Sequence, residues 1–131
     1  MLGHPPAEIN VWLPLTAAFD SNTMRLCGIT ESIAAIKACD ADFRGFDERS
    51  HPEFDSASKP VTLGIGRYIA FNPRCIHATQ FNRTDDTRVS IDFRVIPVRA
   101  YERLRLHYRG TGRNPMAFAP GEYYSAAATA T

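Results

Sequence analysis

Short stretches of alternating hydrophobic and polar residues recur along this chain. In residues 7–15, Ile9, Val11 and Leu13 alternate with residues of other types, which is the period of a β-strand with two unlike faces. Trp12 lies on the face opposite the three aliphatic residues. The pattern therefore predicts a first strand here, with a tryptophan on its more polar face.

The longest alternation covers residues 87–97, TRVSIDFRVIP. Every odd position from 89 to 95 is apolar, and every even position from 88 to 94 is polar. We expect the apolar face to pack against a core. Two alternatives stay open for the polar face: it faces water, or a jelly roll turns it inward to line a small-molecule cavity.

Turn signals separate further short strands, which we expect at residues 23–28, 60–66, 67–72 and 74–79. Helical spacing of apolar residues predicts a short helix over 29–39, with Thr30 or Ser32 as its N-cap, and a second one early in 98–108. Residues 40–59 show no clean periodicity and predict a long, mobile or lid-like loop. The chain is thus expected to be all-β, a sandwich or barrel with one or two short helices.

Composition limits the class of protein. At 131 residues, with 44% hydrophobic and 22% charged residues, the chain is long enough for one globular domain, residues 1–131. The formal net charge is +1, and the arginines of the second half interleave with acidic residues, which argues against a nucleic-acid or anionic-membrane partner. No run has the length of a signal peptide or a transmembrane helix, so we expect a cytoplasmic protein with no membrane partner. Three cysteines without CxxC spacing predict reduced thiols.

Three residues on the polar faces are candidates for chemistry: Trp12, His77 and Arg88. A buried strand normally avoids histidine and arginine, because an unpaired imidazole or charge loses its hydration on burial. Either these side chains face water, or they form a site. Alternation places His77 on the same strand face as Cys75 and Thr79.

Three segments resemble a known family: CIHATQFNRTDDTRVSIDFRVIP (75–97), EINVWLPLT (8–16) and FAPGEYY (118–124). They are similar to the C-terminal half of phytanoyl-CoA dioxygenase-type enzymes, which are non-haem Fe(II) and 2-oxoglutarate-dependent dioxygenases, and especially to the branch that contains streptomycin-biosynthesis protein G. The resemblance implies part of a double-stranded β-helix, or jelly roll, with its core at 7–97 and a C-terminal extension at 98–124. It also implies Fe(II), 2-oxoglutarate as cosubstrate, and a small, secondary-metabolic substrate.

The resemblance assigns roles to individual residues. His77 matches the distal iron-binding histidine, and Arg88 matches the arginine that pairs with the distal carboxylate of 2-oxoglutarate. Trp12 matches a tryptophan beside the cosubstrate, and Ser90 adds a hydroxyl on the face of Arg88. Neutral imidazole suits Fe(II), and a guanidinium binds a carboxylate through two N–H groups. We expect Trp12, His77 and Arg88 to project into one concavity, with His77 and Arg88 on neighbouring antiparallel strands.

The chain departs from the family pattern at the iron site. The family supplies an HxD motif one strand before residues 8–16, and no HxD motif occurs in this sequence. His4 and Glu8 are the nearest substitute ligands, although two intervening prolines keep them from being helical neighbours. We therefore expect an N-terminally incomplete member that is a poor enzyme or none. Two other interpretations stay open: a metal-free jelly-roll module that binds a small carboxylated ligand, and a homodimer that pairs through an exposed sheet edge.

Overall fold

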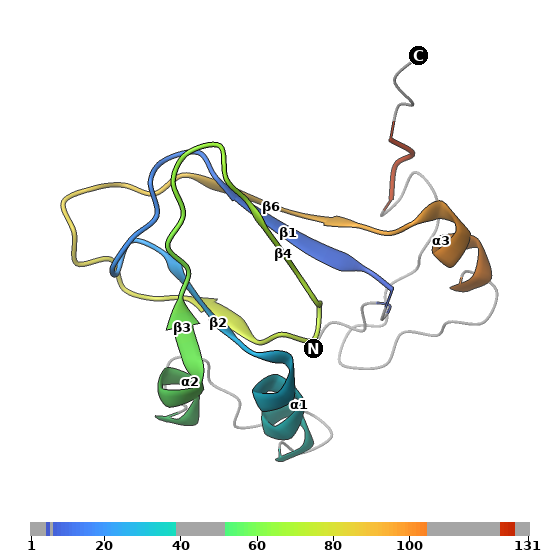
Figure 1. Ribbon diagram of the computed structural model, residues 1–131, viewed down its shortest axis with the longest axis horizontal. Coiled ribbons are helices and arrows are strands. Elements are labelled where there is room, and N and C mark those ends of the chain that lie inside the picture. The colour runs from blue at the N-terminus through green and yellow to red at the C-terminus, as the bar shows by residue number, and fades with distance from the viewer. Residues whose placement is uncertain (1–4, 6, 39–51, 105–123, 128–131) are drawn as a thin grey trace.

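The computed structural model describes residues 5, 7–38, 52–104 and 124–127. Along these residues the elements are β1 (Ile9–Pro14), β2 (Met24–Cys27), α1 (Ile29–Ala38), α2 (Pro52–Ala57), β3 (Ser58–Pro60), β4 (Ile69–Phe71), β5 (His77–Thr79), β6 (Ser90–Val95) and α3 (Val98–Leu104). The strands form two antiparallel sheets, which we name after their central strands. The β1 sheet has the order β4-β1-β6 and the β2 sheet has the order β3-β2-β5 (Figure 1).

The β1 sheet joins strands that are far apart in the sequence. Along β1 and β6, Asn10 pairs with Arg94 and Trp12 pairs with Asp92. Paired residues of an antiparallel ladder project to the same face. The polar face of residues 88–94 therefore lies on the same side of the sheet as Trp12.

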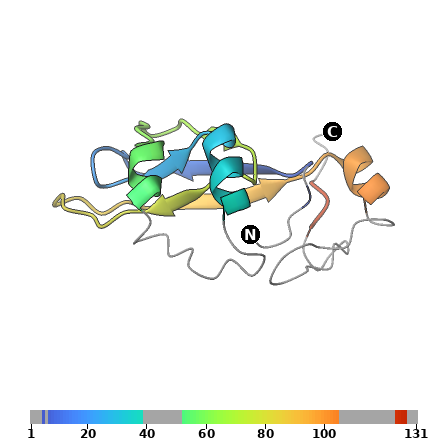
Figure 2. The ribbon, with the colours of Figure 1, turned by 90° about the horizontal axis from the view of Figure 1, so that it is seen from below.

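In the β2 sheet, Leu26 pairs with His77 and Arg25 pairs with Ala78. Leu26 packs against the core, so His77 points to the core side of the sheet. Arg25 and Ala78 project from the opposite face. Figures 1 and 2 show α1 and α2 beside the β2 sheet, on the side away from the β1 sheet.

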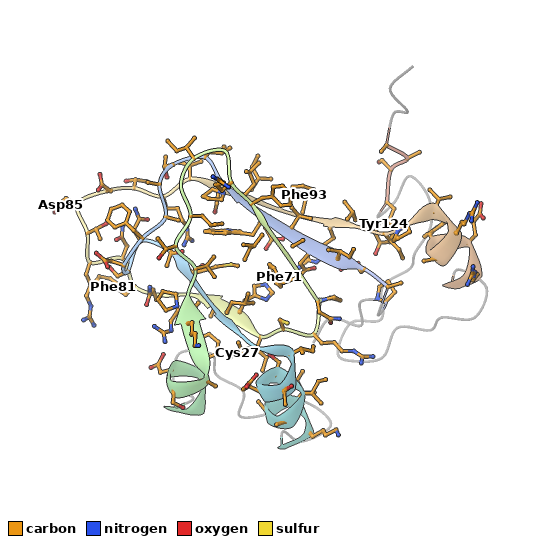
Figure 3. The ribbon with its side chains drawn as sticks, in the orientation of Figure 1. Cys27, Phe71, Phe81, Asp85, Phe93 and Tyr124 are labelled. Atoms are coloured by element: carbon orange, nitrogen blue, oxygen red, sulfur yellow. The ribbon has the colours of Figure 1, made fainter. Side chains whose placement is uncertain are left out.

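The face of the β1 sheet that points inward is the opposite of the one expected from the alternation of apolar and polar residues. Apolar residues of the 89–95 segment are exposed, with Phe93 at 42%, whereas Trp12 on the other face is only 3% exposed. Figure 3 shows Phe93 pointing away from the space between the sheets and Phe71 lying between them. The prediction that the apolar face of residues 87–97 packs against a core is therefore wrong within the described residues. The polar face turns inward instead, which is the second of the two alternatives.

The core between the sheets is small and chemically mixed. It is built from five buried residues contributed by both sheets and their connections: Trp12, Ala18, Met24, Phe71 and Cys75. Buried polar side chains adjoin it, including Glu8 and Asn10 at the start of β1. Burying a polar group is costly unless it is paired, so these side chains need polar partners inside the fold.

Helix α1 confirms the expected helix, but its predicted N-cap is wrong. The helix begins at Ile29, directly after Gly28, so Ser32 lies in its first turn. The Ser32 hydroxyl donates to the carbonyl of Gly28 at 2.7 Å and accepts from the backbone N–H of Ile76 at 2.9 Å. Ser32 therefore ties α1 to the segment that leads into β5.

The predicted long loop at 40–59 is wrong in its second part. Helix α2 and most of β3 occupy residues 52–59, and residues 39–51 lie outside the described residues. The strand expected at 60–66 is reduced to the end of β3 and an isolated bridge between Ala18 and Leu63. The sequence did not predict α2, because a six-residue helix has too few turns to show a helical period of apolar residues.

The described chain is thus mostly β-sheet, with two small antiparallel sheets and short helices, as the sequence predicted in outline. The described strands do not close into a barrel, and a jelly roll stays a prediction. Strands β5 and β6 each have one edge without a described partner strand, so pairing of two copies through such an edge also stays a prediction. Within the described residues, no helix is long and apolar enough to span a membrane.

Candidate functional site

Arg88 lies two residues before β6 and its side chain reaches across the space between the sheets. Its guanidinium carbon lies 5.6 Å from the centroid of the Trp12 ring, a cation–π arrangement. Its Nη2 donates to the hydroxyl of Thr79 on β5 at 3.4 Å. One arginine thus bridges the β1 sheet and the β2 sheet.

The electrostatic state of Arg88 favours anion binding. Burial lowers the pKa of Arg88 from its ordinary value, because desolvation penalises the charged form. An arginine nevertheless stays protonated near neutral pH. Among the described residues its partners are an aromatic face and a hydroxyl, with no carboxylate in an ion pair. A half-buried cation without a counter-ion attracts an anionic ligand.

His77 is held in an orientation that suits a metal ligand. Its Nδ1 lies 2.9 Å from the carbonyl oxygen of Cys75, and its ring packs edge-on against Phe71 with the centroids 5.0 Å apart. A carbonyl oxygen only accepts, so Nδ1 carries the proton of this bond. In the neutral ring, Nε2 then has its lone pair free of a proton, which is the state that binds a metal.

His77 and Arg88 were expected on neighbouring strands, and this is wrong. His77 is in β5 of the β2 sheet, and Arg88 precedes β6 of the β1 sheet. They face the same interior from opposite sides, since Arg88 contacts both Trp12 and Thr79, and Thr79 shares its strand face with His77. The two sheets thus bring Arg88 to Trp12 and to Thr79 on the His77 strand, and a concavity shared by Trp12, His77 and Arg88 stays a prediction.

Glu8 is buried and is already bound by other side chains. It is 1% exposed, its Oε1 lies 3.3 Å from Nε of Arg94, and the hydroxyl of Tyr124 donates to its Oε2. This ties the start of β1 to β6 and to the C-terminal segment. Its role as a metal ligand stays a prediction. His4, the other proposed substitute, lies outside the described residues.

The described residues do not by themselves fit an iron site. They contain no group of three or more His, Cys, Asp or Glu residues placed to hold a metal ion. A facial triad needs two histidines and a carboxylate, and the described residues include one histidine, His77. The sequence also contains an H-x-E arrangement, His51 and Glu53, but His51 and the Glu53 side chain lie outside what the structure describes.

Sequence reasoning placed Ser90 beside Arg88 and overlooked Thr79. Ser90 begins β6 on the same face as Arg88 and pairs with Pro14, which places it at the inner side of the β1 sheet. The hydroxyl that bonds Arg88 belongs instead to Thr79. The signal for Thr79 was available, because it stands two positions after His77 and so shares its strand face.

Comparison with known proteins gives one similarity. The chain is similar to "Streptomycin biosynthesis protein StrG" of Streptomyces griseus, at 31% identity over 101 residues. The aligned region covers 76% of this chain and 36% of the relative, so the chain spans little more than a third of that protein's length. No family model matches the chain, and no solved structure matches it.

Proposed function

We propose that this chain is the cosubstrate-binding part of a non-haem Fe(II) and 2-oxoglutarate-dependent dioxygenase domain of the phytanoyl-CoA dioxygenase type, folded as part of a jelly roll. The observation that carries the proposal is Arg88, a half-buried guanidinium held between Trp12 and Thr79 with no described carboxylate to neutralise it. Similarity to a protein named for streptomycin biosynthesis supports a small, secondary-metabolic substrate.

In this proposal Arg88 binds the distal carboxylate of 2-oxoglutarate. A guanidinium presents parallel N–H groups that match the two oxygens of a carboxylate. Thr79 orients one end of the guanidinium, and the Trp12 ring supports its face and excludes water. Low local polarity then strengthens the ion pair that the ligand completes.

His77 contributes one metal ligand through Nε2, with Nδ1 fixed by the carbonyl of Cys75. Further ligands are needed, and the candidates from the sequence are His4, which lies outside the described residues, and Glu8. With one described ligand, affinity for Fe(II) is expected to be weak and turnover by the isolated chain poor.

A second candidate function is a metal-free module that binds a small carboxylated ligand. It is favoured by Glu8, whose carboxylate is engaged by Arg94 and Tyr124 rather than directed at His77. In this case Arg88 again binds the carboxylate of the ligand, and His77 is a polar residue that lines the site without binding a metal.

The test is calorimetric titration of 2-oxoglutarate into the purified chain, with and without Fe(II). Arg88→Leu is expected to abolish binding, while Arg67→Leu, an exposed arginine in the turn before β4, leaves it unchanged. Equal affinity in wild type and Arg88→Leu would remove Arg88 from this role. Succinate release that requires Fe(II) and vanishes in His77→Ala would support the dioxygenase, whereas binding independent of metal and of His77 would support the module.

A further inference from the structure

A groove lies at the end of the β2 sheet, where β5 runs into the loop that follows it. Its volume is about 730 Å³, within the range of small-molecule sites. Arg25, Ala78 and the α2 residues Phe54 and Asp55 line one part, and Phe81 and Arg83 of the loop line another. Arg25 and Ala78 project from the face of the β2 sheet opposite His77, whereas Thr79, which bonds Arg88, also lines this groove. The groove therefore adjoins the Arg88 site at Thr79, and its arginines and phenylalanines are different residues.

Arg25 is held rigidly at the groove. Its Nε donates to the Ser58 hydroxyl at 2.8 Å, and its Nη2 donates to the carbonyl oxygens of Asp55 at 2.9 Å and Ser58 at 2.8 Å. These contacts cap the C-terminal end of α2 and use the Nε and Nη2 donors of the guanidinium. Nη1 forms no hydrogen bond to a described residue, so a pre-oriented pair of N–H donors is left for a ligand.

The charge of the groove is not neutralised internally. All three bonds of Arg25 go to neutral oxygens, and the Arg83 side chain forms no ion pair with a described carboxylate. Arg83 is anchored through its backbone N–H, which donates to the Ser21 hydroxyl at 2.8 Å. Two arginines against the single carboxylate of Asp55 leave the lining with one net positive charge. Such a site favours an anion.

Two aromatic side chains add an apolar component. Phe54 is 6% exposed and belongs to the wall formed by α2, whereas Phe81 is 80% exposed in the loop after β5. Figure 3 shows Phe81 on this loop, at the end of the molecule far from Tyr124. Stacking of a planar group on an aromatic ring that is this exposed is favourable, because it buries apolar surface of both rings. Ala78, which has a small side chain beside Arg25, leaves room for that ligand.

We infer that this groove binds a small organic anion that carries a planar group. Arg25 Nη1 and Arg83 bind the carboxylate or phosphate, and Phe81 stacks on the planar part. The inference does not depend on the dioxygenase proposal, because none of these residues belongs to the Arg88 site.

The probe is phenyl phosphate, titrated into the full chain by calorimetry alongside inorganic phosphate and benzyl alcohol. We expect phenyl phosphate to bind at one site and more tightly than either partial probe. Arg83→Gln should weaken it by about tenfold or more, since one charge-assisted contact of roughly 1.5 to 3 kcal/mol is lost. Phe81→Ala should remove the preference for phenyl phosphate over phosphate. Neither substitution touches a side-chain contact of the fold.

Arg67→Gln is the matched control and should leave binding unchanged. Arg88→Leu should weaken binding far less than Arg83→Gln, because Arg88 is not part of the groove lining and contacts it through Thr79. If Arg88→Leu abolishes binding, the probe occupies the other site and the inference is overturned. Equal affinities of wild type and Arg83→Gln, or equal affinities for phenyl phosphate and inorganic phosphate, overturn it as well.

Discussion

Arg88 lies over the ring of Trp12, with its guanidinium carbon 5.6 Å from the ring centroid, and Trp12 is the chain's single tryptophan. Tryptophan fluorescence therefore reports on the surroundings of Trp12, which include this contact. An anion that binds Arg88 changes the charge beside the indole and shifts or quenches its emission. We expect a saturable change on adding 2-oxoglutarate, which is absent in Arg88→Leu.

Two controls make this measurement specific. Arg67→Leu should give the wild-type response, because its side chain is exposed and lies outside the space between the sheets. Succinate, which has the two carboxylates but lacks the keto group, should give a smaller response if a metal also binds the keto acid end. A response to 2-oxoglutarate that persists in Arg88→Leu would place the ligand elsewhere.

Glu8 is expected to stabilise the fold. Glu8→Ala leaves the Arg94 guanidinium and the Tyr124 hydroxyl without their buried acceptor. Removing one partner of a buried pair typically costs about 3 to 5 kcal/mol, and the partial exposure of Arg94 moves this case toward the lower end. Urea denaturation measures the loss, with Glu102→Ala on α3 as an exposed control that should change stability by about 0.5 kcal/mol or less. A Glu8→Ala variant as stable as wild type would show that this network contributes nothing.

The strands were largely predictable from the sequence, and the direction of their faces was not. Period-two alternation at 7–15 and 87–97 located β1 and β6 closely, because side chains of a strand alternate whatever surrounds them. Which face points inward depends on the second sheet, and that sheet pairs residues from distant parts of the chain. From hydrophobicity alone we expected the apolar face of β6 to point inward, whereas in the structure the polar face does, with Ser90 and Arg94 partly buried and Asp92 exposed.

The candidate site was predictable residue by residue only where the resemblance supplied a role. It named Trp12, His77 and Arg88, and the structure brings Arg88 to Trp12. Thr79 was missed although it stands two positions after His77 and so shares its strand face. The Glu8 network was missed because a carboxylate that pairs with residues distant in the sequence leaves no local pattern. Arg25 shows the same limit, since two of its three hydrogen bonds go to backbone carbonyls, which any sequence provides.

Two phenylalanines test the inverted faces directly. Phe71 is 9% exposed in the core and Phe93 is 42% exposed on the outer face of the β1 sheet. Phe71→Ala is expected to cost about 3 to 5 kcal/mol of unfolding free energy, and Phe93→Ala distinctly less, because a partly exposed ring loses less burial and leaves no cavity. Chemical denaturation at several protein concentrations compares them. Equal losses that do not depend on concentration would show that the outer face is packed within one chain.

The buried cysteines predict how stability depends on pH. Burial raises the pKa of the Cys27 and Cys75 thiols, and the carboxylate of Glu31 raises that of Cys27 further. Because the folded pKa exceeds the unfolded one, the folded state keeps protons that the unfolded chain releases. The stabilisation is fully present below the thiol pKa of the unfolded chain, about 8.5, and is lost as the pH rises from there through the folded pKa.

Urea denaturation should therefore show the unfolding free energy of wild type falling across that range, and falling less steeply in the Cys27→Ala, Cys75→Ala double variant. Tyrosines and lysines titrate in both proteins, so the difference between the two slopes isolates the thiols. Identical slopes would show that the two thiols ionise as readily in the folded protein as in the unfolded chain.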